Sequence, residues 1–210
     1  STMINDIGTL NVFETARETS VKRVVFACSS AVYGDNPQVP KNEQMRPEPM
    51  SPYAVQKLTG EYYAQIYPDL FGVETVSLRY FNVYGPRHDP SSPYSGVISI
   101  FMSRASQGRA PVIYGDGKQT RDFIFVKDVV SANILAASVQ GIEKEIFNVG
   151  IGSSISINGL WKTISSMAEL TLDPEYGPER PGDILESVSN IDHIKNKLSF
   201  KPKYTLEEGL

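Results

Sequence analysis

The sequence of 210 residues contains only one cysteine and two histidines. A single cysteine, Cys28, excludes an internal disulfide and fits a reducing compartment, so we expect a cytoplasmic location. His88 and His193 lie far from each other and from Cys28, so no metal-site spacing occurs and we predict no bound metal. No signal peptide opens the sequence, and no apolar run approaches ~20 residues, so we expect no transmembrane helix.

Charge of one sign does not gather in any tract. The formal net charge is −4, and 21% of the residues are charged. Since no basic stretch exists, nucleic acid and anionic membranes are poor candidates as partners. Hydrophobic residues make up 40% of the chain, an ordinary value for a globular protein. The length suffices for one full core or for most of a larger domain.

Apolar periodicity predicts strands that alternate with helices. Runs typical of buried parallel strands occupy 23–30, 73–81 and 145–150. Helices are predicted at 3–19, from 51 onward, and at 97–107, 127–139, 158–170 and 190–198. Loops are expected at 82–96 and 178–183, with two short strands around the Gly-Asp-Gly turn at 115–117. The alternation indicates a parallel sheet with crossover helices, and the later, loop-rich part indicates a smaller α/β lobe.

The segment SPYAVQKLTGEYY at 51–63 combines a helix start with two polar side chains one turn apart. Ser51 is a favourable N-cap, and Pro52 suits the first helical position. Tyr53 and Lys57 then lie on the same helix face. An ammonium and the positive helix N-terminus both favour the phenolate, so this pair predicts a tyrosine general base near neutral pH. The alternative is a solvated lysine that lies over an aromatic ring.

The segment FACSSAVYG at 26–34 places two hydroxyl groups directly after a buried strand. Ligands of open α/β sheets bind at the carboxyl ends of the strands, so Ser29 or Ser30 is expected to reach a substrate hydroxyl beside Tyr53. The alternative is that these serines cap or turn the chain.

Five motifs follow one another along the chain: SSAVYG, SPYAVQK, LRYFNVYGPR, GDGKQTRDFIFVKDV and PERPGD. In this order and spacing they resemble the extended short-chain dehydrogenase/reductase superfamily, and within it the nucleotide-sugar epimerases of the UDP-glucose 4-epimerase kind. The resemblance implies an α/β fold, with part of a doubly wound parallel Rossmann sheet that binds NAD and a smaller C-terminal α/β lobe that binds a UDP-sugar. The implied division is 1–82 for the Rossmann part and 83–210 mainly for the substrate lobe, with 121–150 returning to the sheet.

The resemblance also implies a reaction, which is epimerisation at C4 of a UDP-hexose through a 4-keto sugar, with NAD taking and returning the hydride. Tyr53 corresponds to the base that removes the proton of the 4-hydroxyl. Lys57 corresponds to the residue that holds the nicotinamide ribose and lowers the pKa of the tyrosine. Ser29 matches the serine that hydrogen-bonds the 4-oxygen, and these three residues also count as cofactor contacts.

Further positions match other contacts of the resembled family. Tyr80 and Phe81 are expected on the nicotinamide side, although aromatic strand residues are also ordinary core. The substrate contacts that the resemblance implies are Asn82 for a phosphate, Val97, Val112 and Tyr114 for the uridine, Arg121 and Arg180 for the diphosphate, and Asp183 for the ribose. Ser30 is expected to contact a sugar hydroxyl because of its place after the strand. Guanidinium groups suit phosphate oxygens. The alternatives are an ion pair between Arg121 and Asp122 and a solvated loop charge at Arg180.

Two positions bear on the choice of reaction and sugar. Related dehydratases and decarboxylases carry an acid just after the catalytic Ser or Thr, whereas Ser30 and Ala31 stand here, which disfavours dehydration. A bulky Tyr in the resembled epimerases restricts the pocket to plain hexoses, whereas Ser187 stands at the matching position. Ser187 therefore predicts that the UDP-N-acetylglucosamine and UDP-N-acetylgalactosamine pair is accepted along with UDP-glucose and UDP-galactose.

The sequence has no G-x-x-G-x-x-G turn, which in the resembled family holds the cofactor pyrophosphate. The first matching segment, INDIGTLNVFETAR, corresponds to the helix just before the catalytic-serine strand, so the first half of the Rossmann domain is expected to be missing. We therefore expect a fragment whose exposed sheet edge lowers stability or promotes association. The resemblance also implies a homodimer formed through helices that include 51–63.

Two other functions stay open at this point. One is a non-catalytic module that binds a UDP-sugar but lacks the NAD site. The other is a different change to a nucleotide sugar, such as 4-reduction or 5-epimerisation.

Overall fold

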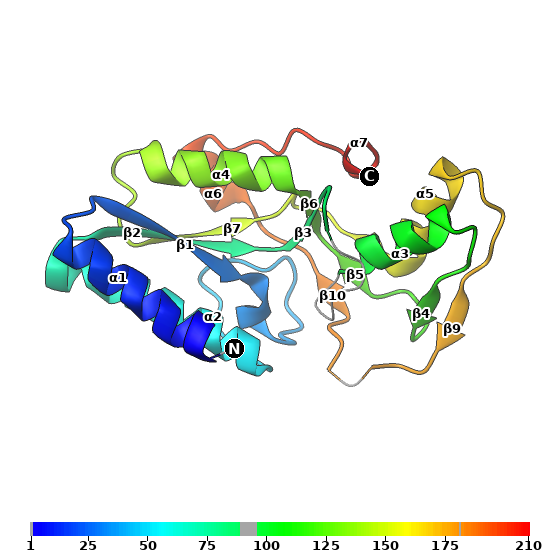
Figure 1. Cartoon of the computed structure of the whole chain (residues 1–210), viewed down its shortest axis with the longest axis horizontal. Helices are drawn as coiled ribbons and strands as arrows, with labels where there is room; N and C mark the ends of the chain where they lie inside the picture. The colour runs from blue at the N-terminus through cyan, green and yellow to red at the C-terminus, as the bar shows by residue number, and fades with distance from the viewer. Residues whose placement is uncertain (1, 89–95, 181) are drawn as a thin grey trace.

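The computed structural model describes residues 2–88, 96–180 and 182–210. A larger lobe is built on a parallel sheet, and a smaller lobe is made of short strands and helices (Figure 1). The main sheet has the order β1-β2-β7, and both of its pairings are parallel. Its strands are β1 (Arg23–Ser29), β2 (Glu74–Tyr80) and β7 (Glu145–Val149), which confirms the three strands predicted from the apolar runs.

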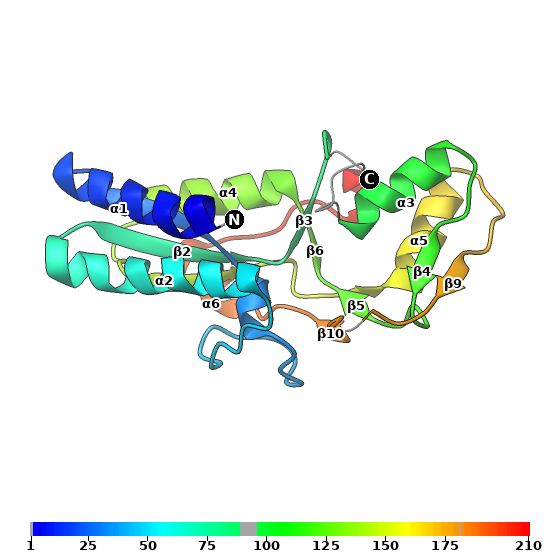
Figure 2. The ribbon, with the colours of Figure 1, turned by 60° about the horizontal axis from the view of Figure 1, so that its bottom comes forward.

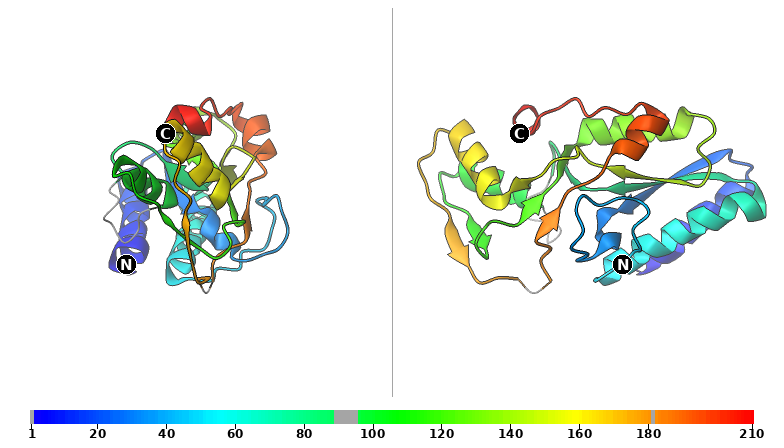
Figure 3. Two further views of the ribbon diagram at one scale, coloured as in Figure 1. Left: turned by 90° about the vertical axis from the view of Figure 1, so that its right-hand side faces the viewer. Right: turned by 180° about the vertical axis from the view of Figure 1, so that it is seen from behind.

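Helices cover both faces of the main sheet (Figure 3). One face carries α1 (Thr9–Glu18), which a π-helical turn (Met3–Gly8) precedes, and α2 (Pro52–Phe71). The other face carries α4 (Val126–Ser138) and α6 (Asp192–Leu198). A parallel sheet between two layers of helices confirms the α/β class that the alternation of strands and helices along the chain predicts.

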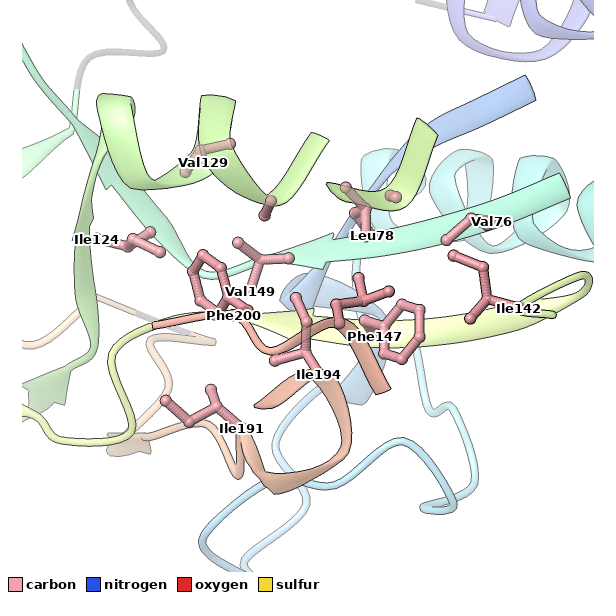
Figure 4. Close-up of a cluster of buried hydrophobic side chains, with 13 residues drawn as sticks. Val76, Leu78, Ile124, Val129, Ile142, Phe147, Val149, Ile191, Ile194 and Phe200 are labelled. Atoms are coloured by element: carbon pink, nitrogen blue, oxygen red, sulfur yellow. The ribbon is translucent and has the colours of Figure 1, made fainter. Parts of the chain in front are cut away.

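The core between the sheet, α4 and α6 consists of aliphatic and aromatic side chains (Figure 4). Alternate residues of β2, Val76 and Leu78, point to this face and are fully buried. The intervening residues of β2 are buried polar side chains that face α2, and Arg79 is the largest of them. Residues 191–200, which the predicted division placed with the substrate lobe, contribute Ile191, Ile194, Leu198 and Phe200 to the core of the main sheet.

The smaller lobe holds helices α3 (Val97–Ser106) and α5 (Ile157–Met167) and most of the small sheets (Figure 2). These helices meet where the rings of Phe101 and Trp161 contact edge to face at 5.8 Å. The small sheets pair β3 (Asn82–Tyr84) with β6 (Phe123–Phe125), β4 (Val112–Tyr114) with β9 (Glu175–Gly177), and β5 (Thr120–Arg121) with both β8 (Ile155–Ser156) and β10 (Glu186–Ser187). Two short helical segments complete the chain, the 3-10 turn η2 (Ser30–Tyr33) and α7 (Leu206–Gly209).

The small sheets depart from the sequence prediction. Residues 82–84, predicted as the start of a loop, form strand β3, whose partner β6 lies about forty residues later, so no local pattern reveals the pairing. The strands around the Gly-Asp-Gly turn do form, but each pairs with a distant strand and not with the other. The predicted loop at 82–96 includes residues 89–95, which lie outside the described residues.

The ends of helix α2 follow the sequence prediction. The Ser51 hydroxyl accepts a hydrogen bond from the Ala54 amide at 3.2 Å, and Pro52 occupies the first turn. Gly72 ends the helix with φ 71°, a left-handed conformation that favours glycine. Among the described residues, no helix is both long and apolar enough to cross a membrane.

Candidate active site

A cavity of about 210 Å³ lies at the carboxyl end of the main sheet, beside β10. Ser29 at the end of β1 lies opposite Tyr80 at the end of β2, so both strands end on this side of the sheet. The predicted site residues that line the cavity are Ser29, Ser30, Tyr80, Phe81, Asn82, Arg121 and Ser187. We call this space the sheet-edge cavity.

Tyr53 and Lys57 lie in the first turns of α2, and Lys57 sits partly over the tyrosine ring. The Lys57 ammonium is 5.8 Å from the centre of that ring and donates a hydrogen bond to the Ala27 carbonyl oxygen at 3.0 Å. Burial lowers the pKa of Lys57, and the Cys28 group acts in the opposite direction. Tyr53 is 48% exposed, so its phenol is open to a ligand. Neither side chain lines the sheet-edge cavity itself.

Ser29 has two functions in the structure. Its hydroxyl oxygen accepts a hydrogen bond from the Ala31 amide at 3.2 Å and so caps the turn η2. It also lines the sheet-edge cavity, as does Ser30. The capping interpretation is therefore correct, and it leaves the Ser29 O–H free in direction to donate to a ligand.

A second cavity, of about 480 Å³, lies between the sheet edge and α3. Its size falls within the range of roughly 300–1,000 Å³ that is common for small-molecule sites. The predicted substrate contacts that line it are Asn82, Val97, Val112, Tyr114, Arg121, Arg180 and Asp183. Because Asn82 and Arg121 line both spaces, this nucleotide-side cavity adjoins the sheet-edge cavity.

Arg121 stands at the junction of the two cavities and is held rigidly. Its guanidinium donates to the carbonyl oxygens of Thr120 at 2.8 Å and Ile184 at 2.6 Å, and it forms an ion pair with Asp183. Burial lowers the pKa of Arg121, and Asp183 opposes that effect. The alternative pairing with Asp122 does not occur. A fixed, half-neutralised guanidinium at this position suits an anionic group such as a diphosphate.

Arg180 reaches the nucleotide-side cavity from the loop after β9. Its guanidinium carbon lies 3.7 Å from the centre of the Tyr114 ring, a stacked cation–π contact. The contact orients an exposed arginine that would otherwise be free in solvent. Val97 and Val112 lie on the apolar wall of the same cavity, where a flat base would bury its faces.

The remaining predicted residues are held by hydrogen bonds, by strand pairing or by burial. Asn82 donates its side-chain amide to the Asp122 carbonyl oxygen at 3.2 Å. The Tyr80 hydroxyl donates to Asn133 of α4 at 2.9 Å, and burial raises the pKa of this phenol. Phe81 is buried and also lines the sheet-edge cavity, so it is both a core residue and part of the cavity wall. Ser187 is 8% exposed and pairs with Arg121 across β10 and β5.

Asp122 and Lys41 contribute to the site but were not predicted. The Asp122 carboxylate accepts hydrogen bonds from the amides of Ile151, Gly152 and Ser189, and so ties three segments around the cavities together. Lys41 lines the sheet-edge cavity from a loop rich in proline. The sequence offers no signal for Lys41, because one lysine in a polar loop looks like a solvated charge.

A dinucleotide would meet residues that suit its nicotinamide end. Lys57 has three N–H donors and uses one on a backbone carbonyl among the described residues, so two can bind ribose hydroxyls. Tyr53 stands beside it at the carboxyl end of β1. No three glycines in the sequence have the G-x-x-G-x-x-G spacing. The residues present therefore fit the nicotinamide ribose and supply no pyrophosphate-binding turn.

Comparison with known proteins agrees with this geometry. Residues 2–150 match the NAD dependent epimerase/dehydratase family. The chain belongs to that family. A UDP-glucose 4-epimerase of Mycolicibacterium smegmatis is 37% identical over 208 residues, which are 99% of this chain and 66% of that protein.

Two solved structures of epimerases superimpose closely on this family member. A UDP-N-acetylglucosamine 4-epimerase from Methanobrevibacter ruminantium, in complex with UDP-N-acetylmuramic acid, has a TM-score of 0.94 and 43% identity and covers 99% of this chain and 68% of its own. A UDP-glucose 4-epimerase from Thermotoga maritima, with UDP-glucose, has a TM-score of 0.94 and 37% identity and covers 99% of this chain and 67% of its own. The chain thus spans about two thirds of the length of these relatives.

Proposed function

We propose that the protein of which this chain is part epimerises a UDP-hexose at C4 through a 4-keto sugar, with NAD as cofactor. The observation that carries the proposal is the pair of adjoining cavities, with Lys57 bonded to Ala27 near the carboxyl end of β1 and Tyr53 beside it, outside the lining of the sheet-edge cavity. The sheet-edge cavity would hold the hexose, and the nucleotide-side cavity would hold the UDP. The family match and the solved UDP-sugar complexes of its relatives support the same substrate class.

In this proposal the reactive residues act on one hydroxyl of the sugar. Tyr53 accepts the proton of the 4-hydroxyl, and Ser29 donates a hydrogen bond to the same oxygen. The Lys57 ammonium, 5.8 Å from the centre of the tyrosine ring, stabilises the phenolate electrostatically. The nicotinamide, when bound, supplies hydride acceptance and return. Because the 4-keto sugar is planar at C4, return of the hydride to its other face inverts that carbon.

The nucleotide is held by charge and by apolar contact. Arg121 and Arg180 would bind the diphosphate, with Asn82 on a phosphate oxygen. Asp183 holds Arg121 in place through an ion pair, and its remaining carboxylate oxygen would accept a ribose hydroxyl. Ser187 leaves the room that an N-acetyl group needs, in keeping with the 43% identical N-acetylglucosamine 4-epimerase.

A homodimer is the second part of the proposal. The exposed face of α2 carries an apolar stripe. Its residues recur every four or seven positions and so lie on one side of the helix, and they are 46–63% exposed: Val55, Tyr62, Ile66 and Leu70. Together with exposed Val12 on the neighbouring α1, this face matches the helices through which the resembled epimerases dimerise. Replacement of Ile66 by Glu should convert the dimer to monomer in light scattering. An unsubstituted protein that is monomeric at high concentration would contradict the dimer.

One alternative keeps a specific observation in its favour. The two arginines of the nucleotide-side cavity, Arg121 and Arg180, would by themselves suit a UDP-sugar-binding module without catalysis. Reduction at C4 or epimerisation at C5 would use the same phenol and are separated by their products.

The deciding experiment is product analysis. The whole protein of which this chain is part is incubated with NAD and UDP-galactose, and the sugars released from the nucleotide are separated by chromatography, with the Tyr53→Phe variant as control. Glucose from the parent and none from the variant supports epimerisation. UDP-galactose that binds but returns unchanged supports the non-catalytic alternative. A C5-inverted sugar supports 5-epimerisation, and NADH-dependent conversion of a supplied 4-keto nucleotide sugar to the 4-hydroxyl sugar supports 4-reduction.

A further inference from the structure

Lys41 is a buried cation in the sheet-edge cavity. The residue is 2% exposed and lines the cavity together with Ser30 of η2 and Ser187 of β10. Its ammonium donates a hydrogen bond to the carbonyl oxygen of Asn36. Within the described part of the chain, Lys41 forms no ion pair with a carboxylate.

The backbone of Lys41 is fixed on both sides. Its amide donates to the Val188 carbonyl oxygen at 2.8 Å, and its carbonyl oxygen accepts from the Asn190 amide at 2.7 Å. The buried side chain of Asn148 donates to the same carbonyl oxygen at 2.9 Å. Lys41 is therefore anchored beside the segment that carries Ser187, and its side chain starts from a defined position on the cavity wall.

The charge of Lys41 lacks compensation that the other cation of this cavity has. Arg121 forms an ion pair with Asp183, whereas the ammonium of Lys41 donates to one neutral carbonyl oxygen. A buried ammonium with so few acceptors is costly unless a further oxygen completes its shell. Burial lowers the pKa of Lys41, and the more distant carboxylates of Asp35 and Glu186 oppose that shift.

We propose that Lys41 is a specificity-determining residue whose ammonium donates a hydrogen bond to a carbonyl or carboxylate oxygen on a substituent of the hexose. The cavity then favours N-acylated or acidic hexoses over plain ones, with Ser187 giving the room and Lys41 the donor. This inference rests on the proposed function, which places the hexose in the sheet-edge cavity. Hydrogen bonds to charged groups typically change affinity by about tenfold or more.

The test is a set of calorimetric titrations with UDP, UDP-glucose, UDP-N-acetylglucosamine and UDP-glucuronate. The proteins are the parent chain, Lys41→Met, Lys41→Arg and the control Lys162→Met, which removes an exposed charge of α5. Lys41→Met should weaken one or both substituted sugars by about tenfold or more, and should change UDP and UDP-glucose by less than about threefold. Loss confined to UDP-N-acetylglucosamine identifies an acyl oxygen, and loss confined to UDP-glucuronate identifies a carboxylate. Lys41→Arg should keep most of the preference.

Three outcomes would overturn the inference. The first is unchanged selectivity in a folded Lys41→Met variant. The second is a loss of affinity for UDP without a sugar that equals the loss for the substituted UDP-sugars. If Lys41→Met does not fold, Lys41→Gln takes its place under the same criteria. The third is a folded chain that does not bind UDP, which removes the nucleotide-side cavity as a UDP site and so differs from failure of the selectivity alone.

Discussion

The buried ion pair between Glu61 and Arg79 couples the helix of Tyr53 to the main sheet. The Arg79 guanidinium donates two hydrogen bonds to the Glu61 carboxylate, at 2.8 and 2.6 Å, and both side chains are 2% exposed. Burial alone would lower the pKa of Arg79, but the hydrogen bonds and charge of its partners outweigh burial and raise it, so the guanidinium stays charged. Removal of one partner from a buried pair leaves an uncompensated charge.

Glu61→Leu should therefore lower the free energy of unfolding by about 3–5 kcal/mol. Glu61→Leu combined with Arg79→Met removes both charges and should recover most of that loss, because apolar replacements of a buried pair are often near neutral. Stacking of Arg79 on the Tyr33 ring at 4.8 Å would be lost in the double variant, so recovery should be incomplete.

Urea unfolding measures both variants, with circular dichroism reporting the secondary structure of the whole chain and fluorescence of Trp161 reporting the smaller lobe. Coincident transitions are required before free energies are compared. The control is Asp116→Asn, which breaks the fully exposed pair with Lys118 and should shift the midpoint far less. A loss of under about 1 kcal/mol in Glu61→Leu, or a double variant no more stable than the single one, would refute the reasoning.

Three further predictions concern packing and ionisation. Gly60→Ala places a methyl group 2.3 Å from the Phe26 ring and should cost about 1–3 kcal/mol of stability, measured in urea. Burial alone would raise the pKa of Glu145, but hydrogen bonds from His193 and Lys197 outweigh burial and lower it. The stability that this pairing contributes is present above the unfolded pKa of about 4.3 and is lost as the pH falls through the lower folded pKa. Glu145→Gln should thus be less stable than the parent at pH 7, with the two converging in acid. Burial raises the pKa of the Cys28 thiol, so a disulfide reagent at pH 8 should label it only after denaturation.

Each of these has a matched control or a contrary result. Gly8→Ala meets its nearest neighbour at 3.5 Å, an ordinary contact, so it should not destabilise, and equal losses at both glycines would contradict the packing argument. A stability difference for Glu145→Gln that persists unchanged in acid would contradict its lowered pKa. Rapid labelling of native Cys28 would contradict its burial.

The main sheet and the helix of Tyr53 were predictable because their signals are local. An apolar run defines β1, and Ser51-Pro52 marks the start of α2 within two residues. The short strands were not predictable in the same way. β3 and β10 have three and two residues, and each is defined by a partner far away in sequence.

The candidate site shows the same contrast. The motif residues Ser29, Asn82 and Arg121 were placed from their resemblance to a family, and the structure gathers them around adjoining cavities. The backbone of Lys41 is fixed by Val188 and Asn190, and the Asp122 carboxylate is fixed by the amides of Ile151, Gly152 and Ser189, which are 29, 30 and 67 positions away. No local pattern encodes these contacts. Residue type alone made Lys41 look solvated, whereas the fold buries it.

The most direct test of the central claim is calorimetric titration of UDP-glucose into the purified chain and its Arg180→Ala variant. Arg180 is exposed and stacked on Tyr114, so the variant should fold like the parent. The account predicts one site per chain, weakened about tenfold or more in the variant because a charge-assisted contact to the diphosphate is lost. A folded parent chain that does not bind UDP-glucose, or equal affinity in both proteins, would contradict the account.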